Sequence, residues 1–333
     1  MKKIFITGSN GFIGSNLCRY FYEKDYEVYG LVRKTSDIHF LEGLNVRLIY
    51  GDLKKPESFE IPADIDYIVH CASIVSDIAD ESQCYSDIYL LAVNLIQKIL
   101  EVNKNLKKVV YISTALTLGF NSQDISEEKP GESTEFLPYA QYKKKTEEYF
   151  LEQFKKERLP MVILRPADVY GPNDRTSCAL ILRACERGVP LIVGHGNWYF
   201  GFCYIDNLCQ AVYLACNKNG IEGKSYTVTN NKLLTWRELF SEFQKGLNRK
   251  QSFYIPVRVA FAVAAINEAI KRIFPKFNPS ITSYRIKRIT SHTTYDISKT
   301  IKELGYEPEN NTEKQIQAII SWYLREKERG LLT

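Results

Sequence analysis

The first half of the chain alternates short, mostly apolar runs with longer segments in which apolar residues recur every three or four positions. The runs cover residues 4–6, 27–33, 46–50, 66–73, 107–114 and 160–164, and the longer segments cover residues 12–24, 86–104 and 139–158. A short apolar run is typical of a strand buried on both faces, and the longer period is typical of a helix. Repeated β–α units therefore predict a parallel sheet with helices on both faces.

The pattern changes from residue 173 onward. Helices are expected at residues 176–187, with residues 203–208 at the head of a further helix, and at residues 256–274, with a short strand at 225–229 and a helix capped by Thr235. This half is smaller, less regular and rich in aromatic residues. It predicts an α+β lobe over the carboxyl edge of the sheet, which is where doubly wound folds bind ligands.

A glycine-rich turn follows the first strand. Its sequence is Thr7-Gly8-Ser9-Asn10-Gly11-Phe12-Ile13-Gly14. Gly8 permits a positive φ, and Gly11 carries no Cβ, so a diphosphate can approach the main chain there. Gly14 allows the next helix to pack close to the strand, and the N-terminus of that helix offers unpaired N–H groups to a phosphate. The turn predicts a dinucleotide site.

Composition limits the classes of function. The 333 residues carry 45% apolar and 25% charged side chains with a net charge of +5, which is ordinary for a globular protein and gives no basic run that favours nucleic acid. Eight scattered cysteines without a Cys-x-x-Cys pair indicate a reducing cytoplasm, and four isolated histidines predict no metal site. Helix 256–274 carries too many charges to span a membrane, so no integral span is expected.

Tyr139 and Lys143 are the candidate catalytic pair. Four positions apart on a helix, the two side chains share one face. A phenol with a pKa near 10 is a poor base at neutral pH, but a neighbouring cation favours the phenolate. Tyr139 is then expected to exchange a proton with a secondary alcohol or a ketone as hydride moves, while Lys143 holds the nicotinamide ribose.

The glycine spacing with Phe12-Ile13 inside it, the Tyr139-x-x-x-Lys143 pair and the Arg-Pro-x-x-Val-Tyr-Gly-Pro turn at 165–172 resemble the extended short-chain dehydrogenase/reductase superfamily. The resemblance covers essentially the whole chain. It implies an α/β fold with a Rossmann-type doubly wound parallel sheet. Residues 1–172 would form the NAD(P)-binding domain, parts of about 200–230 would return to it, and residues 173–333 would be mainly the substrate lobe.

The glycine turn and the resemblance together assign the site residues. The resemblance gives Thr114 the bond to the substrate oxygen, with Ser113 as the alternative, and makes His70 structural. Contacts with the cofactor are expected from Gly8, Ser9, Asn10, Gly11, Phe12, Ile13, Gly14, Arg33, Asp52, Leu53, Cys71, Ala72, Ser73, Tyr139, Lys143, Pro166 and Val169.

The end of the second strand bears on the choice of cofactor. Folds that bind NAD place an acid about 20 residues after the glycines, but Arg33 stands there, followed by Lys34, Thr35 and Ser36. A basic residue suits a 2′-phosphate, so NADP(H) is favoured. Asp37 lies close enough in sequence to keep NAD(H) possible.

The superfamily divides into reductases with diffusing substrates and nucleotide-sugar epimerases or dehydratases. The second class usually carries an arginine that holds the diphosphate, and Phe200 stands at that position here. Together with Trp198 and Tyr204, Phe200 favours an apolar substrate, although these aromatic residues also suit core packing. We therefore expect the 3β-hydroxysteroid dehydrogenase and dihydroflavonol reductase branch, with a nucleotide-sugar epimerase or dehydratase and a non-catalytic redox sensor as alternatives.

Dimerisation through two helices is usual in the superfamily, and the resemblance implies a homodimer through helices 86–104 and 139–158. Helix 256–274 is a candidate lid or membrane-surface contact, whereas its alanine-rich face favours packing in the interior or at a subunit contact. The sequence leaves the substrate and the direction of reaction open.

Overall fold

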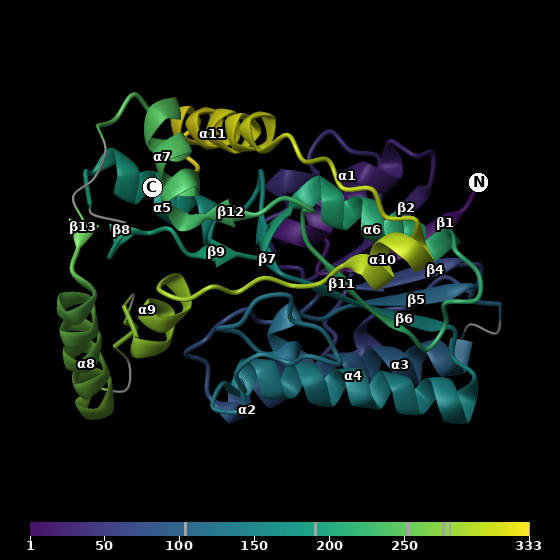
Figure 1. Ribbon diagram of the computed structural model, residues 1–333. Helices are drawn as coiled ribbons and strands as arrows, with labels where there is room; N and C mark the ends of the chain where they lie inside the picture. The colour runs from purple at the N-terminus through teal and green to yellow at the C-terminus, as the bar shows by residue number, and fades with distance from the viewer. Residues whose placement is uncertain (103–104, 190–191, 251–253, 275–276, 280, 333) are drawn as a thin grey trace.

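The protein is built on a seven-stranded parallel sheet (Figure 1). The computed structural model describes residues 1–102, 105–189, 192–250, 254–274, 277–279 and 281–332. The strands are β1 (Lys3–Thr7), β2 (Glu27–Val32), β3 (Val46–Tyr50), β4 (Tyr67–His70), β5 (Lys108–Ile112), β6 (Met161–Pro166) and β11 (Ser225–Val228). Their order is β11-β6-β5-β4-β1-β2-β3, so the order reverses beside β1, where doubly wound folds bind nucleotides. The expected fold is confirmed.

Helices cover both faces of the sheet, as Figure 1 shows. α3 (Leu90–Val102) and α4 (Pro138–Glu157) lie on one face, and α1 (Phe12–Tyr22) and α6 (Ile205–Asn217) lie on the other. Strand β1 divides its side chains between the two layers: Ile4 and Ile6 pack into the core with α1 and α6, and Phe5 packs into the core with α3 and α4. This alternation follows from the two-residue period of a strand.

The helix expected at 86–104 begins earlier and is not regular. Asp80 caps α2 (Glu81–Cys84) in a capping box with Gln83, and a π-helical turn, η3 (Tyr85–Tyr89), joins α2 to α3. The polar cap was not recognised in the sequence, because no apolar period surrounds it. Residues 103 and 104 of the expected helix lie outside the described residues.

The C-terminal lobe consists of short strand pairs and helices. Thr235 caps α7 as expected, in a capping box with Glu238. The pairs are β7 (Asp168–Tyr170) with β10 (Phe202–Tyr204), β9 (Tyr199–Phe200) with β12 (Leu234–Thr235), and β8 (Ile192–Val193) with β13 (Tyr254–Ile255). The helices are α5 (Cys178–Glu186), α7 (Trp236–Gly246), α8 (Val257–Ile273), α9 (Ser283–Ile289), α10 (Ser298–Leu304) and α11 (Thr312–Glu328). The 3-10 turns among the described residues are η1 (His39–Leu41), η2 (Pro56–Ser58) and η4 (Ala115–Leu118).

The two halves of the chain share one hydrophobic core. Trp322 and Tyr323 of α11 belong to the same buried cluster as Ile4 and Ile6 of β1. β11, from the second half of the chain, pairs with β6 in the central sheet. The domain boundaries themselves stay a prediction. Within the described residues, no helix is long and apolar enough to cross a membrane, and no cluster of three metal-ligating side chains occurs.

Candidate active site

The glycine turn has the geometry of a phosphate site. Gly8 has a φ of +66°, and a Cβ on Gly14 would lie 2.1 Å from the Gly8 carbonyl oxygen, so the helix can approach the strand only without that atom. Gly11 precedes α1, and within the described chain no side chain caps this end of the helix and no acid occupies its first turn. The exposed N-terminus of α1 therefore fits an anionic diphosphate.

Ser9 is the exception within this turn. Its side chain is buried, and its hydroxyl donates a hydrogen bond to the Leu31 carbonyl at 3.1 Å. The side chain thus ties the turn to β2, and only its main chain is left for the expected contact with a cofactor. That contact, like those expected of Asn10, Phe12 and Ile13, stays a prediction.

The end of β4 lies directly beside the glycine turn. A Cβ on Gly8 would lie 3.0 Å from the Ala72 nitrogen, so the segment Cys71-Ala72-Ser73 borders the turn, and its contact with a cofactor stays a prediction. Thr7 Oγ1 accepts a hydrogen bond from the Ala72 nitrogen at 3.2 Å and lies 2.8 Å from His70 Nδ1. Burial lowers the pKa of His70 to about 3, so the neutral ring fixes this segment and carries no charge at physiological pH.

The end of β2 leaves Arg33 exposed and engages Asp37. The Asp37 carboxylate pairs with Arg175 at 2.6 Å, and the hydrogen bond from this guanidinium lowers the pKa of Asp37. Asn10 also donates a hydrogen bond to the Asp37 carbonyl at 3.2 Å. Asp37 is therefore not a free acceptor for ribose hydroxyls, whereas the exposed Arg33 suits an anion.

Asp52 and Leu53 follow β3 in a turn stabilised by local hydrogen bonds. The Lys54 nitrogen donates to Asp52 Oδ1 at 2.9 Å. Leu53 is buried, and its carbonyl accepts a hydrogen bond from Asn94 Nδ2 of α3 at 2.7 Å. The turn is thus held to the helix layer, and its contact with an adenine ring stays a prediction, as do the contacts of Pro166 and Val169.

The structure brings the three expected catalytic residues together. α4 begins at Pro138, which places Tyr139 in its first turn and Lys143 one turn later, and both side chains are buried. Lys143 Nζ donates to the Ile112 carbonyl at 2.9 Å and lies 6.0 Å from the centroid of the Tyr139 ring. Thr114, two residues after the end of β5, hydrogen-bonds with Tyr139. These residues are called the Thr114–Tyr139–Lys143 group below.

Burial opposes both charged forms of the pair. Desolvation raises the pKa of Tyr139 to about 12, although the hydrogen bond with Thr114 and the nearby positive charge of Arg288 lower it in part. Desolvation lowers the pKa of Lys143 to about 8, against the opposing effect of Cys71 at the end of β4. The influence of Cys71 on Lys143 links the catalytic group to the segment beside the glycine turn. A positively charged nicotinamide would favour the phenolate further.

Because the Lys143 side chain is buried, we expect the free energy of unfolding to depend on pH. The pKa of Lys143 is about 8 in the folded protein against 10.5 for the free side chain, so in this range the unfolded chain binds a proton that the folded chain does not. The contribution of Lys143 to the free energy of unfolding therefore rises with pH through this range. Relative to Lys143→Met, the wild type should gain roughly 2–3 kcal/mol between about pH 7 and about pH 10 in urea denaturation. A difference that does not change with pH would contradict the prediction.

The Ser113 hydroxyl is used within the protein and is not left free for a contact with substrate. It donates to Glu147 Oε1, and both residues are buried. A serine hydroxyl at the end of a strand commonly bonds to the nearby backbone. The observed partner is instead a carboxylate on α4, one turn beyond Lys143. Ser113 thus connects β5 to the catalytic helix, and Thr114 is left as the hydroxyl beside Tyr139.

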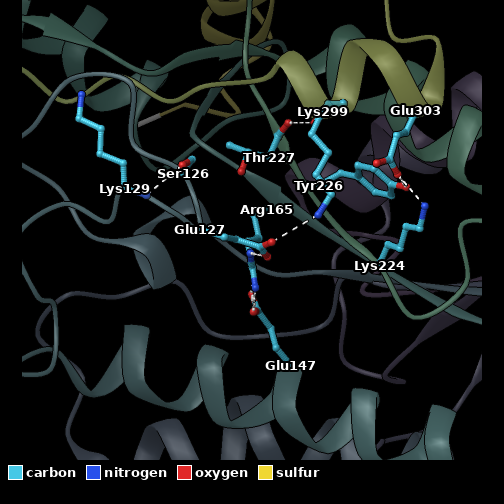
Figure 2. Close-up of polar contacts among 11 residues, drawn as sticks. Ser126, Glu127, Lys129, Glu147, Arg165, Lys224, Tyr226, Thr227, Lys299 and Glu303 are labelled. Atoms are coloured by element: carbon cyan, nitrogen blue, oxygen red, sulfur yellow. Dashed lines mark hydrogen bonds and ion pairs between the residues drawn. The ribbon is translucent and has the colours of Figure 1, made fainter.

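Sequence reasoning missed the charged network around Arg165 (Figure 2). Arg165 Nε lies 3.0 Å from both carboxylate oxygens of Glu147, and Nη2 donates to Glu147 Oε2 at 2.6 Å. Nη1 donates to Glu127 Oε1 at 2.5 Å, and Lys299 pairs with Glu127 at 3.3 Å. The spacing of four residues between Lys143 and Glu147 on one helix face was the signal that could have revealed the network.

A cavity of about 430 Å³ opens on the outer side of this network, between β11, α10 and the loop at 126–128. Three strands separate β11 from β1 in the sheet, so this cavity is remote from the glycine turn. Figure 2 shows Arg165 directed from β6 toward Glu147 on α4, with Glu127 beside it and Lys299 above it. The network therefore connects α4 to the sheet through Arg165 of β6.

The C-terminal lobe contributes a second charged pair that the sequence did not reveal. Arg288 of α9 donates to Asp168 Oδ1 of β7, and its Nη1 lies 3.5 Å from the Tyr284 hydroxyl. Tyr284 packs against the buried cluster that contains Tyr139. α9 therefore brings the Arg288 charge and the Tyr284 phenol near Tyr139 from about 145 to 149 residues farther along the chain.

The aromatic residues expected to contact the substrate divide into two groups. Phe200 and Tyr204 lie in the main core, and the Phe200 ring stacks on Trp236 with centroids 4.0 Å apart. Both therefore match the alternative that aromatic residues fill core space. Trp198 is only partly buried and stacks on His195, with centroids 3.8 Å apart. Its contact with a substrate stays a prediction.

Comparison with known proteins extends the assignment beyond the site. Residues 4–229 match the NAD dependent epimerase/dehydratase family, a span that includes the glycine turn and the whole catalytic group. The chain belongs to this family. The epimerase/dehydratase match confirms the resemblance to extended short-chain dehydrogenases/reductases and identifies the chain as an NAD(P)-dependent enzyme of that type.

Curated relatives from this enzyme class align over nearly the full chain. The sterol-4-alpha-carboxylate 3-dehydrogenase (decarboxylating) of Candida albicans is 26% identical over 345 residues, which cover 97% of each chain. The 2-alkyl-3-oxoalkanoate reductase of Shewanella oneidensis is 28% identical over 321 residues, which cover 91% of this chain and 81% of the relative.

Solved structures in the epimerase/dehydratase family share the fold. The dTDP-glucose 4,6-dehydratase of Bacillus anthracis, in complex with NAD, has a TM-score of 0.73 at 18% identity and covers 99% of this chain and 100% of its own. The UDP-glucose 4-epimerase of Thermotoga maritima, with UDP-glucose, has a TM-score of 0.74 at 19% identity, over 98% of this chain and 99% of its own. At this identity the likeness concerns the fold alone.

Proposed function

We propose that the protein is an NADP(H)-dependent oxidoreductase that interconverts a secondary alcohol and a ketone on a largely apolar, steroid- or flavonoid-like substrate. The observation that carries the proposal is the Thr114–Tyr139–Lys143 group beside the glycine turn. The direct test is oxidation of hydroxysterols with NADP⁺, or reduction of the matching ketones with NADPH, followed by the absorbance of NADPH. No turnover across such a panel would count against the apolar substrate class.

Each residue of the group has a separate task in this reaction. The bound nicotinamide would supply or accept the hydride. Tyr139 Oη would remove the alcohol proton during oxidation and return one to the ketone oxygen during reduction. The Thr114 hydroxyl would orient that same oxygen, and Lys143 would hold the ribose hydroxyls and favour the phenolate. The burial of all three side chains excludes bulk water from the proton transfer.

The relatives' names support the substrate class. The Candida albicans relative is named for a sterol carboxylate that is dehydrogenated at carbon 3. The Shewanella oneidensis relative is named for the reduction of a 2-alkyl-3-oxoalkanoate. Both names describe redox chemistry on a carbon of a largely apolar molecule. The residue at position 200 also supports it, because a nucleotide-sugar enzyme usually has a diphosphate-binding arginine there and this chain has Phe200.

Arg33 should decide the preference for NADPH. The side chain is exposed at the end of β2, and its neighbouring acid Asp37 is paired with Arg175. A charge-assisted bond to the 2′-phosphate contributes about 1.5–3 kcal/mol, so Arg33→Glu should raise the Kd for NADPH about 10- to 100-fold and change that for NADH little. Fluorescence titration with both nucleotides checks this. Arg47→Gln removes another exposed arginine near the same sheet edge and should leave both affinities unchanged, whereas equal losses for both nucleotides in Arg33→Glu would refute the assignment.

The alternative is an NAD-dependent nucleotide-sugar 4-epimerase or dehydratase. Such an enzyme would purify with NAD bound and would convert UDP-sugars without added cofactor. That result would replace the leading proposal. We also propose a homodimer through α3 and α4 and a cytoplasmic location, which the eight free cysteines support. Light scattering of the purified protein tests the oligomeric state.

A further inference from the structure

Helix α8 exposes an unusual amount of apolar surface. Ile266 and Ile273 are 61% and 71% exposed, and Phe274, directly after the helix, is 63% exposed. Among the residues of α8 itself, only Ala260 and Ala264 are buried. The other exposed apolar side chains of the helix are Val259, Phe261 and Val263. Figure 1 shows α8 at the outer end of the C-terminal lobe, beside α9.

A surface helix usually turns its large apolar side chains toward the protein, but α8 does the reverse. Ala260 and Ala264 lie one turn apart and pack in a small cluster with Val193 and with Ile286 of α9. Because successive residues are 100° apart on a helix, Ile266 and Ile273 fall on the opposite side. The helix thus turns small side chains toward the protein and large apolar side chains toward the outside.

The charges on α8 complete the pattern. Glu268 is the single acid of the helix, and its carboxylate accepts hydrogen bonds from the nitrogen and the hydroxyl of Ser283, so it faces α9. Arg258 near the start of the helix and Arg272 near its end are exposed. The outer surface of α8 therefore combines apolar and cationic groups and presents no competing carboxylate.

We propose that α8 binds to the surface of a lipid bilayer that contains anionic lipids. Apolar side chains flanked by arginines are the composition of an interfacial helix, in which the apolar groups enter the acyl boundary and the cations meet anionic headgroups. A second copy of the chain fits less well. The helix has 17 residues, so its outer face is about 25 Å long and about 10 Å wide, well below the ~800 Å² per partner of a stable interface.

This location would serve the proposed function, on which this part of the inference rests. α8 packs on α9, and α9 carries Tyr284 into the buried cluster around Tyr139. Binding through α8 would therefore hold the substrate lobe against the bilayer, where a steroid-like substrate accumulates. Binding itself does not require catalysis, so it can be tested separately.

The test is flotation of the full-length protein with vesicles of phosphatidylcholine alone or mixed with phosphatidylglycerol. We expect the wild type to float with the mixed vesicles and to bind less at higher salt, because the headgroup attraction is screened. Ile266→Glu/Ile273→Glu should reduce the bound fraction about tenfold or more, and Arg258→Gln/Arg272→Gln should reduce it on mixed vesicles. Leu180→Glu alters an equally exposed leucine on α5 and should bind like the wild type.

Two outcomes would overturn the proposal. One is equal binding by the wild type and Ile266→Glu/Ile273→Glu. The other is absence of wild-type binding to the mixed vesicles, including the case in which light scattering reveals a dimer that depends on Ile266 and Ile273. Circular dichroism and NADPH titration of each variant show whether its fold is retained. Failure of the proposed function would appear instead as lack of turnover, with vesicle binding unaffected.

Discussion

Replacing Tyr139 by Phe should lower kcat by about 10²- to 10⁴-fold, because the variant loses the hydroxyl that exchanges the proton with the substrate oxygen. The ring is buried in the cluster with Leu137 and Ala140, and Phe preserves that packing. The Kd for the nicotinamide nucleotide should change little, since Lys143 and the glycine turn are intact. Steady-state rates and fluorescence titration of NADPH measure the two quantities separately.

Tyr142→Phe is the matched control for this substitution. Tyr142 lies on the same helix, but it is only partly buried, and its ring contacts Tyr85 at a centroid distance of 6.2 Å. Its hydroxyl therefore should not affect turnover. If Tyr139→Phe and Tyr142→Phe had the same activity as the wild type, Tyr139 would not be the proton donor and acceptor. Loss of nucleotide binding in Tyr139→Phe would show a structural defect.

The parts of the site predicted from sequence are those with local geometry. The glycine spacing fixes a strand, a turn and a helix within eleven residues, from Ile4 to Gly14, and the structure has each of these elements. Tyr139 and Lys143 are one helical turn apart, so their common face follows from the helix itself. The order of the β–α units likewise predicts parallel pairing. Each crossover helix brings the chain back to the end of the sheet where the previous strand began, so the next strand runs in the same direction.

The parts that could not be predicted depend on contacts between distant segments. Arg288 and Asp168 pair across 120 residues, and nothing in either local sequence indicates the other. Phe200 illustrates a second difficulty: an aromatic residue in a lobe has the same pattern whether it lines a substrate site or packs on Trp236. The turn from Tyr85 to Tyr89 is π-helical, and its apolar period resembles that of an ordinary helix.

Glu147→Leu should destabilise the fold by about 3–5 kcal/mol, because it leaves the buried Arg165 guanidinium without its principal partner. Glu147 accepts three hydrogen bonds from Arg165 and one from the hydroxyl of Ser113. Glu127 alone cannot replace these bonds, because it reaches only Nη1. Urea denaturation gives the free energy of unfolding, and the loss should be present whether or not a nucleotide is bound.

Two comparisons decide whether the buried charge is the cause. Glu152 lies on the same helix and forms an exposed pair with Lys156, so Glu152→Gln should cost less than about 1 kcal/mol. Glu147→Leu/Arg165→Leu removes both buried charges and should recover part of the stability lost in Glu147→Leu, because no unpaired cation remains. The opposite result would be a double variant with a lower free energy of unfolding than Glu147→Leu, as expected when a second buried side chain is replaced. Lost packing would then explain the destabilisation in Glu147→Leu. The network would then anchor the catalytic helix by shape and not by charge.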